Sequence, residues 1–396
     1  MRKYFLAAAA TAVLSNAPAA WADDVKIGII LGFTGPIESL TPGMAMGAEL
    51  AISEVSDSGM LLGGMTVSPV RGDSTCIDSA AALAAAERLI TADKVNAIMG
   101  ADCSGVTGAI LQNAARPNGI VMISPSATSP GLSTAEDDGL FFRTAPSDAR
   151  QGQVMTDVIM DRGIKSVALT YTNNDYGKGL ADSFQAAFEA AGGEVTINAP
   201  HEDGKGDYSA EVGALAAAGG EVLVVAGYLD QGGRGIIQGS LDSGAFGTFV
   251  LPDGMIGESL PAAIGPDLDG SFGQTAGTDS PGMAQFADLA NAAGFDGNAP
   301  YVSQAYDAAA LLLLAMQAAG SSDSQMIKGT VMDVANAPGE TIFPGELAKG
   351  LKILADGGDI DYVGASAVEL IGPGESSGNY QEVEIRGGAI ETVRYR

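Results

Sequence analysis

Two short segments rich in serine and threonine are the clearest places for polar chemistry in this chain. They read GADCSGVT at 100–107 and SPSATSP at 124–130, and each follows an apolar run, 95–99 and 120–123. Hydroxyl groups and free backbone N–H groups at strand ends suit a carboxylate ligand, because both donate hydrogen bonds without an arginine. Ordinary N-capping by Ser and Thr also explains each residue singly. Taken alone, each segment leaves both interpretations open.

Residues for common enzyme chemistry are scarce. The chain has one histidine, His201, in a polar stretch where we expect a solvated loop residue. A single histidine cannot supply an HExxH motif or a multi-histidine metal site. The segment GESSG at 374–378 formally matches a nucleophile elbow, but no histidine follows it, as that fold requires. DLDG at 267–270 is expected to be a turn and not a calcium loop. We therefore predict no enzymatic activity and no cofactor or metal.

The chain has two cysteines, Cys76 and Cys103. In an oxidising compartment an isolated pair of this kind indicates one disulfide. A reactive thiol and a metal site are the alternatives. Two cysteines and one histidine make a poor ligand set for a metal, which favours the disulfide.

The first 22 residues have the pattern of a secretory signal peptide. Arg2 and Lys3 precede an apolar stretch at 4–14, and Ala20-Trp21-Ala22 is a small-x-small cleavage site. The apolar stretch is too short to cross a bilayer. We expect the mature chain to begin at Asp23 and to work in the periplasm.

Composition limits the partners. The 396 residues carry a net charge of −28, and 46% of them are hydrophobic. Long-range repulsion excludes nucleic acid and an anionic membrane surface as partners, because both carry the same sign of charge. A globular chain of this length is expected to form two domains.

Short β-type apolar runs alternate with alanine-rich helical segments in two successive series. Strands are expected at 25–31, 67–70, 95–99, 120–123, 167–171, 195–198, 222–226, 249–251 and 272–276. Helices are expected at 42–55, 78–90, 106–115, 151–160, 179–191, 210–218, 236–242, 282–293, 301–319 and 324–334. Continuous apolar strands that alternate with helices predict an α/β fold with parallel sheets covered on both faces. The Gly-Gly within 382–393 predicts a hairpin. Such sheets bind ligands at the carboxyl ends of their strands.

Several motifs in order resemble one family over the whole mature chain. They are VKIGIILGFTGPIESLTPGMAMGAELAISEV at 25–55, DSTC at 73–76, GADCSGVT at 100–107, SPSATSP at 124–130, FRT at 142–144, NNDYGKGLA at 173–181, AGY at 226–228, LPDG at 251–254, YDA at 306–308 and DYVGAS at 361–366. Together they are similar to type I periplasmic solute-binding proteins of the leucine/isoleucine/valine-binding group of ABC transporters.

The resemblance implies two Rossmann-like lobes with parallel central sheets, joined by a three-segment hinge. The implied bounds are 23–144 and 277–351 for the first lobe, 145–276 and 355–396 for the second, and crossings near 144–148, 274–279 and 350–358. It also implies capture of a small, branched-chain-like amino acid between the lobes and delivery to a membrane permease. We expect a monomer in which hinge closure completes the site.

The resemblance further assigns roles to individual residues. Cys76 and Cys103 match the family's disulfide. The implied ligand contacts are Ser104, Ser126, Ala127 and Thr128 for the carboxylate, Asp253 for the ammonium, Tyr176 and Tyr228 as cleft aromatics, and Leu40 in the first loop. Asp253 could also be a simple turn residue beside Pro252 and Gly254, and the two tyrosines could be interface aromatics.

Two departures from the family pattern keep other functions open. Leu40 stands where the branched-chain binder has an aromatic residue, and Asp253 replaces a glutamate. The alternatives are a binder of the same fold for an amide, urea or aromatic or other small carboxylate, and a ligand-presenting sensor protein. A secreted hydrolase is a further rival, against which the single histidine argues. An α-amino acid remains the best ligand class, because a buried zwitterion needs a partner for both of its charges.

Overall fold

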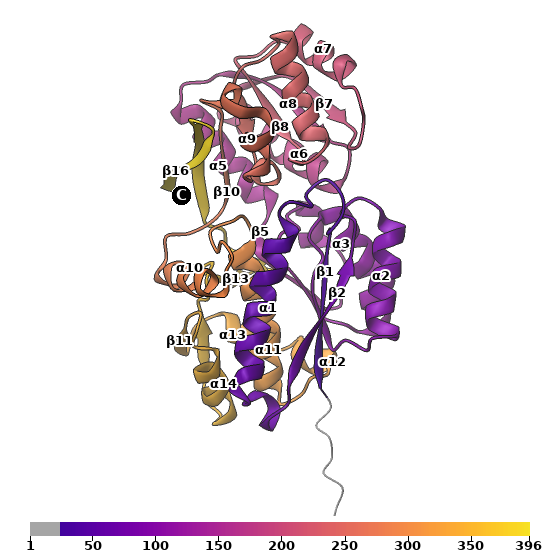
Figure 1. The fold of residues 1–396 in the computed structure, drawn as a ribbon, viewed down its shortest axis with the longest axis vertical. Coiled ribbons are helices and arrows are strands. Elements are labelled where there is room, and N and C mark those ends of the chain that lie inside the picture. The colour runs from indigo at the N-terminus through magenta and orange to yellow at the C-terminus, as the bar shows by residue number, and fades with distance from the viewer. Residues whose placement is uncertain (1–23) are drawn as a thin grey trace, which may run out of the picture.

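A computed structural model describes residues 24–396, and the predicted signal peptide lies outside this range. Two seven-stranded sheets, one above the other in Figure 1, form the framework of the molecule. A separate pair of short strands, β11 (Glu340–Ile342) and β12 (Ile360–Tyr362), lies beside the first sheet. Within residues 24–396, no helix is both long and apolar enough to span a bilayer.

The first sheet carries the amino-terminal βα series. Its spatial order is β13 (Leu370–Ile371), β14 (Glu375–Ser376), β5 (Phe141–Pro146), β4 (Met122–Ser124), β3 (Ala97–Gly100), β1 (Val25–Leu31) and β2 (Val67–Asp73). Strands β1 to β5 are parallel, and β13 and β14 form a short antiparallel pair at one edge. Strand β1 is buried along almost its whole length, as a strand between two helical layers must be.

The second sheet repeats this arrangement. Its order is β16 (Ala389–Tyr395), β15 (Tyr380–Arg386), β10 (Phe272–Ala276), β9 (Phe249–Leu251), β8 (Val222–Ala226), β6 (Ser166–Thr172) and β7 (Glu194–His201). Strands β15 and β16 are antiparallel and form the predicted hairpin, which turns at Gly387 and Gly388 with φ of +58° and +78°. The Asp269 carboxylate accepts hydrogen bonds from both glycine N–H groups, so the predicted turn at 267–270 supports this hairpin.

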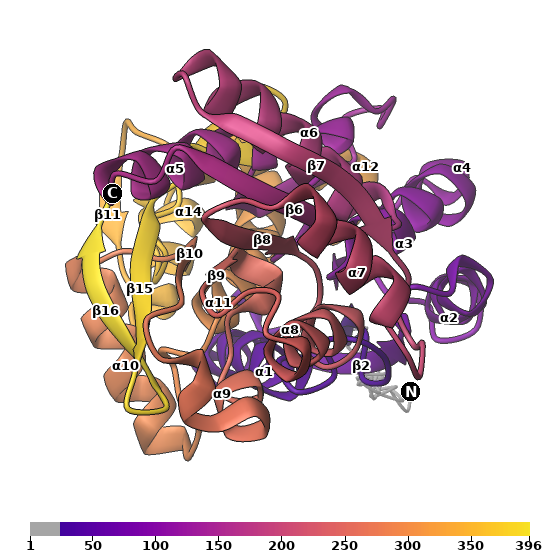
Figure 2. The ribbon, with the colours of Figure 1, turned by 90° about the horizontal axis from the view of Figure 1, so that it is seen from above.

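Helices cover both faces of each sheet. Those of the first half are α1 (Thr41–Ser58), α2 (Ser79–Thr91), α3 (Ser104–Ile110), α4 (Arg116–Asn118), α10 (Pro281–Ala293), α11 (Val302–Ala319), α12 (Ser324–Ile327), α13 (Val331–Ala335) and α14 (Leu347–Ala355). Those of the second are α5 (Asp148–Asp161), α6 (Asp175–Ala190), α7 (Ser209–Ala218), α8 (Gly232–Ser243) and α9 (Ser259–Ile264). Figure 2 shows α5 and α6 on one face of the second sheet, with α7 and α8 on the other. The almost wholly buried α11 packs against α1 in the first half.

Three chain crossings join the halves and lie side by side. The first follows Pro146 and the second follows Ala276. The third crossing expected near 350–358 disagrees with the strand pairing. Residues 360–376 still pair within the first half, so the chain crosses between Ser376 and Tyr380 and not near 350–358. The Gly277 N–H donates to the Asn379 carbonyl over 3.0 Å, which ties the second crossing to the third.

A buried ion pair fixes the edge strand β14 onto the first sheet. The Arg143 guanidinium on β5 is 1% exposed and contacts the Glu375 carboxylate at 2.5 Å. The same guanidinium donates to the carbonyls of Ala127 and Ser129 at 2.9 and 3.0 Å. The Arg143 side chain thus fixes both β14, which precedes the third crossing, and the loop that follows β4.

Two other sequence expectations need correction. His201 is not solvated: it ends β7 with 1% exposure, and its Nδ1 lies 2.9 Å from the Thr170 hydroxyl. Burial lowers its pKa to about 4, so the ring is neutral at physiological pH. The helix expected at 324–334 is interrupted, because α12 ends at Ile327 and α13 begins at Val331.

The Cys76–Cys103 disulfide is present, with its Cα atoms 5.1 Å apart. It joins the loop after β2 to the loop after β3 and therefore fixes two neighbouring strand ends next to each other. Both residues are buried, at 3% exposure each.

We predict that removing this disulfide destabilises the fold without abolishing it. The bridge spans a sequence separation of 27, for which the chain-entropy relation gives about 3 to 4 kcal/mol. The double variant Cys76→Ser/Cys103→Ser should lose this amount in urea unfolding under oxidising conditions. Reductant should lower the unfolding free energy of the native protein but not that of the variant, and an equal effect on both would contradict the assignment.

Candidate functional site

The strand order defines where a ligand site should lie. The first sheet contains the order β2-β1-β3-β4-β5, and the second repeats it as β7-β6-β8-β9-β10. In open parallel sheets of this order, ligands bind beyond the carboxyl ends of the strands, where the winding reverses. That point lies between β1 and β3 in the first sheet and between β6 and β8 in the second.

A cavity lies at this point and takes its walls from both halves. Its lining residues are Ile37, Leu40, Met44, Asp102, Cys103, Ser104, Ser126, Tyr176, Tyr228, Asp253, Gly254 and Tyr301. Of the predicted ligand contacts, only Ala127 and Thr128 are missing from the lining. The free space is only about 20 Å³, so a bound solute must move side chains or separate the two walls.

Asp253 is the centre of the polar wall. It follows β9 at the start of a short 3₁₀ turn, η4 (Asp253–Met255), and is 3% exposed. The Tyr176 hydroxyl donates to its Oδ1 over 2.7 Å, and the Tyr301 hydroxyl donates to its Oδ2. Burial, together with the Asp253 charge, raises the pKa of both tyrosines well above the usual value, so both remain protonated donors.

Two aromatic rings build the side of the cavity that belongs to the second half. Tyr176 is the second residue of α6, after β6, and Tyr228 follows β8. Their rings stack with centroids 5.1 Å apart and planes 15° apart. Burial raises the pKa of Tyr228 well above its usual value, and the nearby Asp203 and Asp102 carboxylates add to this shift. Tyr176 therefore contributes both to the aromatic wall and to the Asp253 hydrogen bonds.

The hydroxyl-rich wall belongs to the first half. Ser104 starts α3, and its Oγ accepts from the Ser129 N–H over 3.1 Å, so its own proton is available to a ligand. The Ser126 hydroxyl donates to the Asp102 carbonyl over 3.0 Å. The Ala127 N–H donates to the Ser124 hydroxyl over 2.9 Å. The backbone donor expected from Ala127 is therefore already used within the protein.

Tyr301 is a cavity residue that the motifs did not identify. It precedes α11 with a φ of +63°, an uncommon conformation for an aromatic residue and one enriched at functional sites. Because α11 packs in the first half, its hydrogen bond to Asp253 joins the two halves. Nothing in the sequence around Pro300 signals the left-handed conformation that turns this ring into the cavity.

Asp102 is another cavity residue that was not among the predicted ligand contacts, and further ones are Ile37, Met44 and Gly254. It lies between β3 and α3 and is 1% exposed. Its Oδ2 accepts from the Gly32 N–H over 2.6 Å, and its Oδ1 accepts from the Ser74 hydroxyl over 2.9 Å. Burial raises the pKa of this carboxyl, and these two donors act in the opposite direction. The sequence offered only an acidic residue beside Cys103 as a signal.

The loop between β1 and α1 contacts the second half directly beside the cavity. The Asp230 carboxylate accepts from the Ser39 N–H over 3.0 Å and from the Ser259 hydroxyl over 2.7 Å. The Asp230 N–H in turn donates to the Pro36 carbonyl over 3.0 Å. Pro36 and Ser39 of the first half thus contact Asp230 and Ser259 of the second, and we call these four residues the rim contact.

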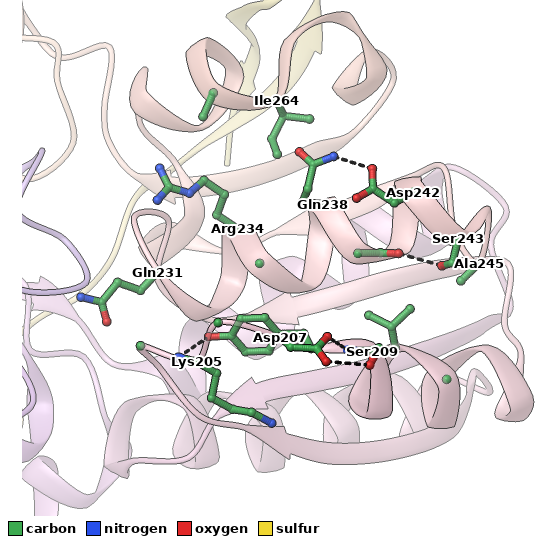
Figure 3. Close-up of a pocket in the computed structure, with 18 of the residues that line it drawn as sticks. Lys205, Asp207, Ser209, Gln231, Arg234, Gln238, Asp242, Ser243, Ala245 and Ile264 are labelled. Atoms are coloured by element: carbon green, nitrogen blue, oxygen red, sulfur yellow. Dashed lines mark hydrogen bonds between the residues drawn. The ribbon is translucent and has the colours of Figure 1, made fainter.

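A much larger hollow of about 1,070 Å³ lies elsewhere, among α7, α8 and α9 (Figure 3). It is open, and its charged groups already have partners within the protein. The Lys205 ammonium pairs with Glu211, and the Arg234 guanidinium donates to the Asp230 carbonyl over 2.7 Å. Size alone therefore does not make it the functional site: all of its lining residues belong to the second half, whereas the cavity takes its walls from both halves.

The sequence of residues 24–338 matches the profile of a family described as periplasmic binding proteins. The chain belongs to this family. A relative from Brucella melitensis, named Leu/Ile/Val-binding protein homolog 1, is 33% identical over 334 residues, or 83% of this chain and 87% of the relative. A Leu/Ile/Val/Thr-binding protein from Salmonella typhimurium is 28% identical over 65% of this chain and 69% of its own length.

Solved structures share the fold of this family member. A leucine-binding protein LivK from Thermotoga maritima superposes with a TM-score of 0.78 at 23% identity, covering 94% of this chain and 98% of its own. A Rhodopseudomonas palustris solute-binding protein in complex with benzoate gives 0.75 at 20% identity, covering 94% and 96%. The same fold therefore occurs with chemically different ligands.

Behind the cavity, Asp148 is a buried carboxylate at the first crossing. It starts α5 with 0% exposure, and within residues 24–396 neither carboxylate oxygen has a hydrogen-bond partner. Burial raises its pKa well above the usual value, the nearby Asp253 charge adds to this shift, and Thr128 and Arg143 oppose it. Ionised Asp148 is thus a destabilising group in the folded protein.

We predict that Asp148→Asn stabilises the protein at neutral pH. A pKa raised in the folded state gives stability that is complete below the unfolded value of about 3.8 and is lost as pH rises through the folded pKa. The variant should gain about 1 to 3 kcal/mol at pH 7, and the difference should vanish below pH 3.8. Urea unfolding between pH 3 and 8 measures this, and a difference independent of pH would contradict the titration of Asp148.

Proposed function

We propose that this protein is an extracytoplasmic solute-binding protein of an ABC importer that captures a small α-amino acid and delivers it to a membrane permease. It binds its ligand as a monomer in the periplasm and performs no covalent chemistry. The observation that carries the proposal is the cavity between the halves, which has an acidic group on one wall and hydroxyl groups on the other.

The acidic wall suits an ammonium group. Asp253 accepts one hydrogen bond at each oxygen from Tyr176 and Tyr301. A carboxylate has about four acceptor positions, so two remain for N–H donors of the ligand. No Lys or Arg is among the residues that line the cavity. A buried charge requires a partner, and a ligand ammonium supplies one.

The hydroxyl wall suits the carboxylate of the same ligand. The Ser104 hydroxyl lines the cavity and retains its proton for donation. Thr128 is 1% exposed, and its hydroxyl lacks a hydrogen-bond partner among residues 24–396. We assign the Ser104 hydroxyl to the ligand carboxylate. Thr128 lies outside the cavity lining, and its hydroxyl is close enough to the Asp148 carboxyl to oppose the rise of that pKa. An aromatic carboxylate would satisfy this wall but would leave Asp253 facing a group without positive charge.

Capture follows from the arrangement of the two halves. In the open form the ligand binds first to the wall of Ser104, and rotation about the three crossings then brings Tyr176, Tyr228 and Asp253 onto it. The rim contact of Pro36, Ser39, Asp230 and Ser259 forms only when the halves meet. The closed form is the one offered to the permease.

Ligand-dependent thermal unfolding tests the class of ligand. The protein should first be unfolded and refolded to remove bound solute, and then assayed against L-amino acids, amides and small aromatic acids. A ligand at 1,000 times its Kd adds about 4 kcal/mol, which raises the Tm by several degrees in a chain of this size. A shift with L-amino acids is expected, and a shift only with amides or aromatic acids would overturn the proposal.

We predict that Asp253→Asn weakens amino-acid binding by at least about 30-fold, because truncating a buried charge pair costs about 2 to 5 kcal/mol. Asp267→Asn is the matched control, since Asp267 is exposed in the same half and away from the cavity. Isothermal titration calorimetry measures both variants. Equal affinity of Asp253→Asn and the native protein would remove Asp253 from the site.

We predict that Asp230→Ala shifts the protein toward the open form. The substitution removes one hydrogen bond between the halves, from the Ser39 N–H, and one within the second half, from the Ser259 hydroxyl. The backbone bond to Pro36 and the bond between the Ser39 and Ser259 hydroxyls remain. Without ligand, small-angle X-ray scattering should give a larger radius of gyration than for the native protein. With saturating ligand the two radii should agree, and the variant's affinity should fall about 3- to 10-fold, in line with about 1 kcal/mol for a hydrogen bond. An unchanged radius and affinity would show that the rim contact does not stabilise closure.

A further inference from the structure

The cavity presents a carboxylate on each of its two walls. Asp253 belongs to the second half, and Asp102 belongs to the first half, between β3 and α3. With the ligand ammonium assigned to Asp253, Asp102 has no assigned ligand contact. Two buried carboxylates in one cavity without a lysine or arginine among its lining residues call for a ligand with hydrogen-bond donors at two places.

Asp102 is held in a defined position. The Gly32 N–H and the Ser74 hydroxyl bind its two oxygens at 2.6 and 2.9 Å. Gly32 directly follows β1, so the carboxylate is anchored at the base of the loop that carries Ile37 and Leu40. These two hydrogen bonds use two of about four acceptor positions on the carboxylate. The backbone N–H groups of Asp102 and Cys103 also act on this carboxyl and lower its pKa, while its charge helps to raise the pKa of the cavity residue Tyr228. A ligand donor would therefore compete with these two backbone groups for the remaining acceptor positions.

The remaining cavity residues indicate which part of the ligand meets Asp102. If Asp253 takes the ammonium and Ser104 the carboxylate, the side chain of the amino acid faces the rest of the wall. Ile37, Leu40 and Met44 make that wall apolar, and Asp102 is its charged residue. An aliphatic side chain of the ligand would lie against the Asp102 carboxylate without donating a hydrogen bond. A ligand side chain with an O–H or N–H group would donate one.

We propose that Asp102 is a specificity-determining residue, which selects a small amino acid with an O–H or N–H donor on its side chain over the aliphatic amino acid of the same shape. This inference rests on the proposed function as an amino-acid binder. The preference has a physical basis, because a site built to hydrogen-bond a hydroxyl rejects the analogue without it far more strongly than an apolar pocket rejects a methyl change.

Isosteric ligand pairs test the proposal directly. Threonine and valine differ by a hydroxyl in place of a methyl group, and asparagine and leucine differ by an amide in place of a branched alkyl group. Titration calorimetry of the native protein with the four L-amino acids should give at least tenfold tighter binding of the polar member in one pair or both. Asp102→Leu should remove or reverse that preference, measured as the ratio of the two affinities in each pair.

Two further variants separate ligand selection from a structural role of Asp102. Asp102→Asn can keep both internal contacts through its oxygen and its NH₂ group, but it removes the charge. The preference for the polar amino acid should therefore decrease in this variant. It serves as the test if Asp102→Leu does not fold. Ser74→Ala removes one internal partner of Asp102 outside the cavity lining. It should lower the Tm without changing the ratio of affinities.

The outcomes distinguish this inference from the proposed function. Binding of L-amino acids with valine and leucine as tight as their polar partners would overturn the role of Asp102 and leave the proposed function intact. An affinity ratio that stays at its native value in both Asp102→Asn and Asp102→Leu would also overturn it. Absence of binding to every α-amino acid would overturn the proposed function, and this inference with it.

Discussion

The arrangement of the two halves depends on one buried carboxylate, Asp253. Its hydrogen bond from Tyr176 lies within the second half, whereas that from Tyr301 comes from the start of a helix of the first. A carboxylate at this depth is tolerable only with hydrogen-bond donors around it. The same group that holds the closed halves together is thus the group that a cationic ligand end would bind. Under the proposed function, ligand capture and closure therefore depend on the same atoms.

The repeated topology explains why these residues meet. Each sheet has the order in which the second and third helical connections lie on the opposite face from the first, and each therefore has one point where the winding reverses. The two such points face each other, so loops distant in sequence converge: Leu40 and Asp102 from one half, Tyr176, Tyr228 and Asp253 from the other. The disulfide and the Arg143–Glu375 pair hold the loops of the first half in place.

Much of this arrangement could be predicted from the sequence, because buried parallel strands are continuous apolar runs with clear ends. Strands 25–31, 222–226, 249–251 and 272–276 begin and end where expected. The third crossing could not be predicted, since β13 and β14 are two residues each and have too little pattern to assign to a sheet.

The cavity lining could be predicted where a motif carried the residue, as for Ser104 and Asp253. It was not predictable where tertiary packing decided. A left-handed backbone conformation directs Tyr301 into the cavity. The Ala127 N–H donates a hydrogen bond to the Ser124 hydroxyl and not to a ligand. His201 was expected in solvent because its neighbours are polar, but it ends a buried strand.

The side-by-side crossings have a mechanical consequence. Gly277 is hydrogen-bonded to Asn379, and a Cβ on Gly378 would lie 2.8 Å from the Pro146 Cβ, so the three segments form one narrow strap. Under the proposed function, the two halves would rotate about this strap when they close. Three adjacent connections would guide that rotation more narrowly than a single flexible linker, so closure would bring the same loops together each time.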